Sequence, residues 1–256
     1  SLRELKCLIK LDCKEIDMQA NIPKTIHYVW LGGKPLTPLA EKCIESWKKC
    51  CPDYQIVRWD ESNFDVKQNR YCREAYDAKK WAFASDYARL WVLVNEGGIY
   101  MDTDVEVLRP LDDFLELQAF SCFEADDRLS TGLMASSPHQ PFFEKLLRDY
   151  DGRSFVKPNG SFDLTTNVVA ITNACVDKGL VLNNCKQTVD GFTLFPSEYF
   201  SPKDWETKKV RITNNTYAIH HFDSSWLPAN LRFREKVKAA IGFEKINKLK
   251  ILLGRM

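Results

Sequence analysis

A strand–helix–strand pattern directly after Pro23 constrains the fold of this chain most strongly. Residues 25–31 (TIHYVWL) form a β-branched and aromatic run that ends at a glycine pair, which predicts a buried strand followed by a loop. Thr37 then fits the N-cap of a helix over residues 38–49 that begins with proline, and residues 54–59 (YQIVRW) predict the next strand. Two strands joined by a helix at this spacing are typical of a parallel α/β fold.

The remaining segments extend this pattern without an internal repeat or a low-complexity linker, and a hydrophobic content of 45% is enough for a sizeable core. Periodicity and turn residues predict further helices at 80–95, 141–150 and 164–178, and strands at 99–101, 105–108, 119–124, 131–136, 189–195 and 216–222. We therefore expect one α/β domain over residues 22–228, flanked by a helical extension at 1–21 and a basic amphipathic helix at 229–256.

The composition also bears on the compartment. Residues 1–20 carry four basic and four acidic side chains, and no run of about 18 apolar residues occurs, so we expect neither a secretory leader nor a membrane span. A targeting segment removed ahead of the first residue is left open. The nine cysteines form no CxxC pair and no zinc-spaced cluster, which favours reduced thiols and a cytoplasmic location.

The C-terminal segment is electrostatically distinct from the rest of the chain. Residues 231–256 hold eight basic and two acidic side chains, a net charge of +6 in a chain whose total is +1, with apolar residues at helical spacing between them. Such a helix either lies on the inner, anionic face of a membrane as a peripheral anchor or docks on its own domain, and both interpretations stay open. Nucleic acid is not an expected partner, because the basic run is confined to one end and has little aromatic interleaving.

Two aspartates, Asp102 and Asp104, directly follow the short apolar run at 99–101. Aspartate is a poor strand former, and such a local conflict with the strand pattern is typical of a functional site. Carboxylates that converge at a strand end suit Mg²⁺ or Mn²⁺, which also accept phosphate oxygens as ligands. The alternative for so short a pattern is a turn with two solvated aspartates.

Upstream, Asp86 and Arg89 are three residues apart on the helix predicted at 80–95, so they share one helix face. Taken alone, the two residues are typical of an intrahelical surface ion pair of small energetic value. Their position shortly before the acidic pair makes a shared site the second interpretation.

Three blocks of this sequence resemble one enzyme family. The stretch ASDYAR at 84–89 followed by GGIYMDTDV at 97–105 is similar to the signature of the glycosyltransferases with a DXD sugar-binding region. That family includes fungal mannosyltransferases, bacterial capsular-polysaccharide enzymes and, more distantly, the large clostridial glucosylating toxins. The blocks at 22–33 and 220–226 resemble its first strand and a C-terminal block, in the same order.

The resemblance implies a GT-A fold, a Rossmann-like α/β sheet that binds a nucleotide sugar at the carboxyl ends of its strands. It implies a metal-dependent hexosyltransferase that retains the anomeric configuration. The expected donor is a UDP-sugar, and the expected acceptor is a glycan or a lipid-linked oligosaccharide of polysaccharide biosynthesis.

Residue roles follow from the same resemblance. Asp104 is the expected principal metal ligand, and Asp102 is expected on the ribose and donor sugar or on the metal through water. Asp86 is expected on the sugar hydroxyls, with Arg89 bracing Asp86 or the acidic pair.

Three further residues are expected around the nucleotide sugar. Trp30 is expected to stack on the base, Tyr100 to line the ribose or phosphate pocket, and Asn167 to contact the donor sugar. The alternative for Asn167 is a role in capping or lining the helix at 164–178.

In the C-terminal block, the resemblance places His221 and Ser224 on the metal and Trp226 on the leaving phosphate. Imidazole is a better ligand for Mn²⁺ than for Mg²⁺, so Mn²⁺ is the expected ion and Mg²⁺ the alternative. The alternative for a histidine pair on a late strand is that one histidine is buried and hydrogen-bonded while the other is solvated, and we expect this description to fit His220. The alternative for Trp226 is a core residue.

The sequence offers no clear carboxylate nucleophile, and Asp126 and Asp127 are weak candidates. We therefore expect a same-face displacement in which the departing phosphate takes the proton of the acceptor hydroxyl. A haloacid-dehalogenase-type phosphohydrolase also places two aspartates after an apolar strand, but it is disfavoured for two reasons. In that class the motif follows the opening strand, and a Thr or Val stands two residues after the second aspartate, where this chain has Glu106. A non-catalytic carbohydrate- or lipid-binding protein of the same fold is the remaining alternative.

Overall fold

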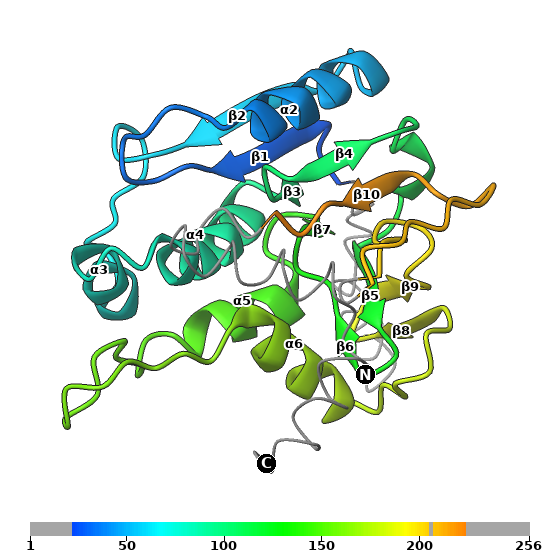
Figure 1. Cartoon of the computed structure of the whole chain (residues 1–256). Helices are drawn as coiled ribbons and strands as arrows, with labels where there is room; N and C mark the ends of the chain where they lie inside the picture. Colours follow the sequence, from blue (N-terminus) through cyan, green and yellow to red (C-terminus); the bar gives the residue numbers. More distant parts are fainter. Residues whose placement is uncertain (1–21, 205–206, 224–256) are drawn as a thin grey trace, which may run out of the picture.

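The computed structural model describes residues 22–204 and 207–223, and a mixed β-sheet forms its centre (Figure 1). Three neighbouring strands at one end of the sheet are parallel, in the spatial order β2 (Gln55–Trp59), β1 (Thr25–Val29) and β3 (Gly98–Met101). Parallel strands bring their carboxyl ends to one edge of a sheet. The chain therefore leaves β1 and β3 side by side at that edge.

The other half of the sheet reverses direction. β7 (Leu133–Ser136) lies antiparallel between β3 and β5 (Ala119–Ala125), and β9 (Phe192–Phe195) runs parallel to β5. β8 (Gln187–Val189) closes the far edge, and β6 (Arg128–Leu129) pairs with the end of β5. Since β3 and β5 are parallel to each other through β7, the end of β5 reaches the same edge as the end of β3.

A second, two-stranded sheet crosses this edge. It consists of β4 (Val105–Val107) and the antiparallel β10 (Ala218–His220), with His220 directly opposite Val105. Only Asp102, Thr103 and Asp104 separate β3 from β4. The small sheet therefore holds the acidic turn beside a late segment of the chain.

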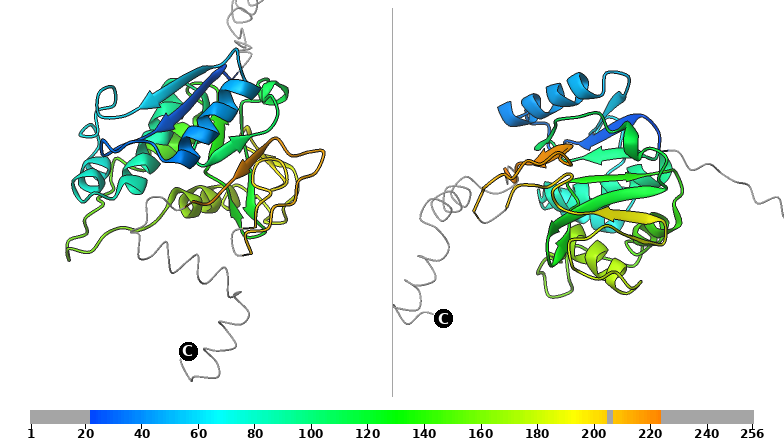
Figure 2. Two further views of the ribbon diagram at one scale, coloured as in Figure 1. Left: turned by 45° about the horizontal axis from the view of Figure 1, so that its top comes forward. Right: turned by 90° about the vertical axis from the view of Figure 1, so that its right-hand side faces the viewer.

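Helices cover both faces of the central sheet (Figure 2). One face carries α2 (Pro38–Cys50), and a single-turn helix η1 (Asp112–Phe114) belongs to the same core cluster. The other face carries α3 (Arg70–Asp77), α4 (Trp81–Asn95), α5 (Pro141–Arg148) and α6 (Asn167–Val176).

Strand alternation divides the core between these two faces. Tyr100 packs into the cluster that contains α4, whereas Ile99 and Met101 pack into the cluster that contains α2. Both sides of β3 are buried, so the strand that carries the acidic turn is fixed from above and below.

A pair of glycines joins α4 to β3. Gly97 and Gly98 both have positive φ, and a Cβ on Gly98 would lie 2.6 Å from the carbonyl oxygen of Thr25 in β1. Glycine is the residue that adopts this conformation without strain. It ends α4 and starts β3 against β1 within two residues.

The predicted α/β fold is confirmed, and most predicted elements lie within two residues of the observed ones. The strand predicted at 189–195 is wrong: β8 and β9 form a hairpin there, because Asp190 and Gly191 both have positive φ and reverse the chain. The helix at 164–178 is shorter than predicted, and α3 was not predicted. The predicted helices at 1–21 and 229–256 lie outside the described residues, so the predicted domain boundaries stay predictions.

Two further observations concern the part of the chain that the structure describes. All seven cysteines in it are free, and all but Cys185 and the half-buried Cys50 are buried. No helix in it is both long and apolar enough to cross a bilayer.

Candidate active site

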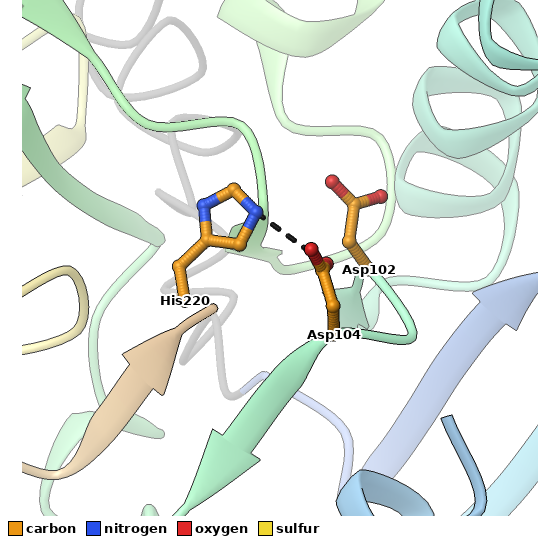
Figure 3. Close-up of side chains that lie close together, drawn as sticks. All are labelled: Asp102, Asp104 and His220. Atoms are coloured by element: carbon orange, nitrogen blue, oxygen red, sulfur yellow. Dashed lines mark ion pairs between the residues drawn. The ribbon is translucent and has the colours of Figure 1, made fainter. Parts of the chain in front are cut away.

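The acidic turn between β3 and β4 brings side chains from three elements together. The main-chain N–H of Asp102 donates to the carbonyl of Gly132 (2.7 Å), and the N–H of Val105 donates back to the carbonyl of Asp102 (3.0 Å), which closes the turn. The carboxylates of Asp102 and Asp104 both face the imidazole of His220 on β10 (Figure 3). One ligand atom from each of the three residues lies within 4.8 Å of the others.

Asp102 is held from the inner side by two donors. Its Oδ1 accepts hydrogen bonds from Arg89 Nη2 (3.1 Å) and from the Tyr100 hydroxyl (2.9 Å). Arg89 also donates to the carbonyl of Thr131 (2.8 Å), and its guanidinium lies over the Tyr100 ring at 4.7 Å. The prediction that Arg89 braces the acidic pair agrees with this geometry.

This arrangement corrects the expected position of Tyr100. Its side chain is 1% exposed and packs in the core, so it does not line a ribose or phosphate pocket in this structure. The reason is the alternation of β3, which points the ring toward α4 and leaves only the hydroxyl to reach Asp102. Tyr100 is a positioning residue for Asp102.

Behind Arg89 lies a second buried carboxylate, Asp86. Its Oδ1 is 3.5 Å from Arg89 Nη2, and its Oδ2 accepts from the main-chain N–H of Asn167 (3.2 Å). Burial raises the pKa of Asp86 to about 6, although the neighbouring Arg89 opposes the shift. The interpretation as a surface ion pair is wrong, because both side chains are buried.

The structure also contradicts the expected sugar contact of Asn167. The residue is 1% exposed; its Nδ2 donates to the carbonyl of Asp86 (2.7 Å), and its Oδ1 accepts from the Tyr150 hydroxyl (2.7 Å). Both polar groups of the side chain are therefore used inside the protein. Asn167 instead begins α6 and joins it to α4, which is close to the alternative role in lining the helix.

Asp104 is held from the outer side. Its Oδ2 accepts from the main-chain N–H of Asp223 (2.8 Å), and its Oδ1 lies 3.4 Å from His220 Nε2. Burial works against both charges, but their mutual attraction prevails: the pKa of His220 rises to about 9 and that of Asp104 falls to about 2. This ion pair is the electrostatic centre of the site.

The expected ligand His221 lies elsewhere, and this is a correction by one residue. His221 Nε2 is 2.8 Å from Glu106 Oε2, while only its main-chain N–H reaches Asp104, at the carbonyl (2.9 Å). Successive side chains along an extended chain point to opposite sides, so His220 and His221 cannot both face the acidic turn. His220 takes the place predicted for His221. Ser224 and Trp226 lie outside the described residues.

The donor set fits a divalent cation. Two carboxylates and one imidazole converge from β3, β4 and β10, and such a mixed O/N set suits Mn²⁺ better than Mg²⁺. Asp102, Asp104 and His220 are the residues that would hold the ion.

Trp30 follows β1 at the same edge of the sheet. Its indole N–H donates to the carbonyl of Lys34 (2.7 Å), and the half-buried ring packs against the core on the α2 side. This hydrogen bond fixes the ring where β1 leaves the sheet. Stacking of a base on Trp30 stays a prediction.

Sequence reasoning missed two charged residues at the site. Glu124 lies at the end of β5 and interacts electrostatically with His220 and Asp102. Lys203 donates from Nζ to the carbonyl of His221 (2.5 Å), and burial lowers its pKa with a further contribution from Lys208. A sequence signal for Glu124 was present, since an acidic residue lies near the end of a buried strand, much as Asp102 directly follows one. No sequence signal links Lys203 to the acidic turn.

Comparison with known proteins gives these residues a family context. Residues 38–121 match the model of the glycosyltransferase sugar-binding region containing a DXD motif. "Inositol phosphoceramide mannosyltransferase 3" of Schizosaccharomyces pombe is 30% identical over 140 residues, which are 52% of this chain and 38% of that protein. "Uncharacterized glycosyltransferase L373" of Acanthamoeba polyphaga mimivirus is 28% identical over 222 residues, 81% of this chain and 84% of that protein. A solved structure, "PaToxG Glycosyltransferase", is 23% identical, with a TM-score of 0.43 over 58% of this chain and 70% of that one.

The chain covers different shares of these relatives. The chain spans only 38% of the length of the S. pombe relative but 84% of the mimivirus relative. Asp86, Arg89, Asp102 and Asp104 all lie inside the region that the family model matches. The chain is therefore similar, over residues 38–121, to the glycosyltransferase sugar-binding region containing a DXD motif.

Proposed function

We propose that this protein transfers a hexose from a nucleotide-sugar donor, with a UDP-sugar and Mn²⁺ as the expected pair, to a hydroxyl of a glycan or lipid-linked acceptor. The observation that carries the proposal is the convergence of Asp102, Asp104 and His220 at the carboxyl edge of the sheet. Both aspartates lie within the match to the glycosyltransferase sugar-binding region. Open α/β sheets bind their ligands at this edge. The name of the S. pombe relative, an inositol phosphoceramide mannosyltransferase, supports a lipid-linked acceptor.

The main chemical requirement of the reaction is stabilisation of the negative charge on the leaving diphosphate. A divalent cation, when bound, supplies electrostatic stabilisation of that charge. Among the described residues, Lys203 interacts electrostatically with Asp104 and with Lys208, and Lys208 Nζ lies 5.9 Å from the centre of the Phe222 ring. Arg89 serves the diphosphate poorly, because its guanidinium already contacts Asp102, Asp86 and Thr131.

The acceptor hydroxyl must lose a proton as the glycosidic bond forms. Asp127, a weak candidate for a nucleophile, is paired with Arg128 at 2.8 Å, and Asp126 is exposed. We therefore keep the same-face displacement, in which the departing phosphate oxygen takes this proton and the anomeric configuration is retained. A covalent sugar–enzyme adduct trapped and located by mass spectrometry would contradict it.

Donor hydrolysis tests the proposed function directly. A panel of UDP- and GDP-sugars is incubated with Mn²⁺, Mg²⁺ or EDTA, and free sugar is measured for the wild type, for Asp104→Ala and for the exposed control Asp77→Ala. We expect metal-dependent release from one donor that Asp104→Ala loses and Asp77→Ala keeps. If no donor is hydrolysed and none binds by calorimetry, the alternative of a non-catalytic carbohydrate- or lipid-binding protein takes precedence.

We further propose a cytoplasmic enzyme that reaches a lipid-linked acceptor through residues 229–256, which lie outside the described residues. The support is their net basic, amphipathic sequence, which is typical of segments that bind anionic bilayers. The test is a truncation after residue 228. Unchanged binding to anionic liposomes and unchanged activity on a lipid-linked acceptor would refute the membrane role.

A further inference from the structure

One acidic side chain at the site has no assigned part in the reaction. Glu124 lies near the end of β5, and Phe120 and Cys122 precede it on the same side of the strand. Both of these residues belong to the core cluster that also contains Ala218 of β10. Alternation up to Phe123 would direct Glu124 to the side of the sheet on which β10 presents His220. Because the pairing of β5 with β6 shifts register between Phe123 and Ala125, the surroundings of Glu124 decide its direction.

The surroundings of Glu124 confirm this direction. Its carboxylate interacts electrostatically with His220, Arg128 and Asp102. In the segment between β6 and β7, the carbonyl of Gly132 accepts a hydrogen bond from the N–H of Asp102. Glu124 and the acidic turn thus lie at the same edge of the sheet.

Glu124 differs from the other carboxylates there in its partners. Asp102 accepts from Arg89 and Tyr100, and Asp104 accepts from a main-chain N–H and pairs with His220. Within residues 22–204 and 207–223, no hydrogen bond and no ion pair within 4 Å reaches Glu124, although its side chain is partly buried and burial raises its pKa. A desolvated carboxylate without a donor is unfavourable, and such groups are typical of ligand sites.

We propose that the Glu124 carboxylate accepts a hydrogen bond from a hydroxyl group of a sugar bound beside Asp102 and His220. The inference rests on the proposed function, because it assumes that a sugar occupies this edge. A hydroxyl fits the requirement: it donates one hydrogen bond, adds no charge to a site that already holds three carboxylates, and several are present on every hexose. That hydroxyl belongs either to the donor hexose or to the acceptor glycan, and the two sources give different kinetics.

The test uses Glu124→Gln and Glu124→Ala in the full chain, with Glu116→Gln as the control. Glu116 is exposed and lies shortly before β5, so its variant makes the same charge change outside the candidate site. Four quantities are measured: the melting temperature, the Kd of UDP with Mn²⁺, the KM and kcat of donor hydrolysis, and the KM for the acceptor.

We expect Glu124→Gln to melt at about the same temperature as the wild type, since among the described residues this carboxylate makes no hydrogen bond and no ion pair within 4 Å that would be lost, and to bind UDP unchanged. If the donor hexose is the ligand, kcat/KM for donor hydrolysis falls about 10- to 100-fold, the range for a lost hydrogen bond to a charged group. If the acceptor is the ligand, hydrolysis is kept and the KM for the acceptor rises by a similar factor. Glu124→Ala changes the same quantity, and Glu116→Gln changes none.

Three results would overturn the assignment. A lowered melting temperature with weakened UDP binding would make Glu124 a structural residue. Kinetics of Glu124→Gln equal to those of the wild type would leave no sugar contact, and a sugar adduct on Glu124 would make it a nucleophile. The proposed function fails in a different way, namely when the wild type itself neither binds nor hydrolyses any nucleotide sugar.

Discussion

The two aspartates of the acidic turn are one residue apart, yet they have opposite surroundings. Asp102 is held on the inner side by Arg89 and Tyr100, which are part of the core between β3 and α4. Asp104 is held on the outer side by His220 and a main-chain N–H of the segment after β10. Core packing fixes the inner partners in place. Of the outer partners, one is a candidate metal ligand, and the other is the main chain of a late segment.

This difference suggests a division of labour. A carboxylate whose partners are a buried guanidinium and a phenol keeps its position when a ligand arrives, so Asp102 orients. A carboxylate opposite a histidine can exchange that ion pair for a cation, because both groups are ligands. Three measurements can break or sharpen this contrast, and a fourth tests a second one between two histidines.

The largest effect is expected for Asp104→Asn. Loss of the outer carboxylate should lower kcat/KM of donor hydrolysis by roughly 10³-fold or more, about 4 kcal/mol, because charge stabilisation at the leaving group is lost. Added Mn²⁺ should raise the melting temperature of the wild type but not of this variant. Asp77→Asn serves as the control, and a variant that keeps Mn²⁺-induced stabilisation while Asp102→Asn loses it would reverse the assigned roles.

Asp102→Asn should act mainly on stability. Arg89 is buried and would lose a charged partner, which costs about 3 kcal/mol of the free energy of unfolding. Chemical denaturation measures this loss, and Arg89→Met in the same background tests its origin. In Asp102→Asn, Arg89 keeps Asp86 as a charged partner, at 3.5 Å. If the loss comes from the missing second partner of the guanidinium, the double variant recovers part of it; a double variant that is less stable than either single one would contradict the explanation.

The inner side extends to Asn167. We expected this residue to contact the donor sugar, but its side chain makes hydrogen bonds inside the protein. Asn167→Leu leaves the carbonyl of Asp86 and the hydroxyl of Tyr150 without their partners, so we expect a loss of about 2.5 kcal/mol in unfolding free energy. Asn173→Leu on the exposed side of α6 is the matched control and should be near neutral. A donor KM that rises while stability is unchanged would restore the sugar contact.

The inner and outer sides also differ in how far the sequence predicted them. The turn, the strand before it and Arg89 as a brace follow from local pattern, because glycine pairs, apolar runs and helix spacing are properties of neighbouring residues. The exchange of His221 for His220 depends on which side of β10 faces β4, and this is set by the pairing of His220 with Val105. Glu124 and Lys203 depend on how distant segments meet, and one sequence carries no direct signal for that.

The smallest effect concerns a second contrast, between two histidines whose pKa values shift in opposite directions. Asp104 raises the pKa of His220, whereas burial lowers the pKa of His27 in β1 to about 4. The Nδ1 of His27 accepts a hydrogen bond from the indole N–H of Trp59 (3.0 Å), which requires a neutral ring. A lowered folded-state pKa means that the neutral ring stabilises the fold above pH 6.5 and that this contribution is lost as the pH falls toward 4.

Between pH 7.5 and pH 5, His27 should therefore reduce the free energy of unfolding by about 2 kcal/mol. Other groups titrate in this range, His220 among them, so the measurement is the difference between the wild type and His27→Gln by urea denaturation at each pH. Glutamine accepts the bond from Trp59 but does not titrate, and its curve should fall less steeply by that amount. If the two curves are parallel, protonation of His27 is not the source of the pH-dependent loss of stability. The fold would then tolerate a charged ring at this buried position, where the Nε2 of His27 has no hydrogen-bond partner among the described residues.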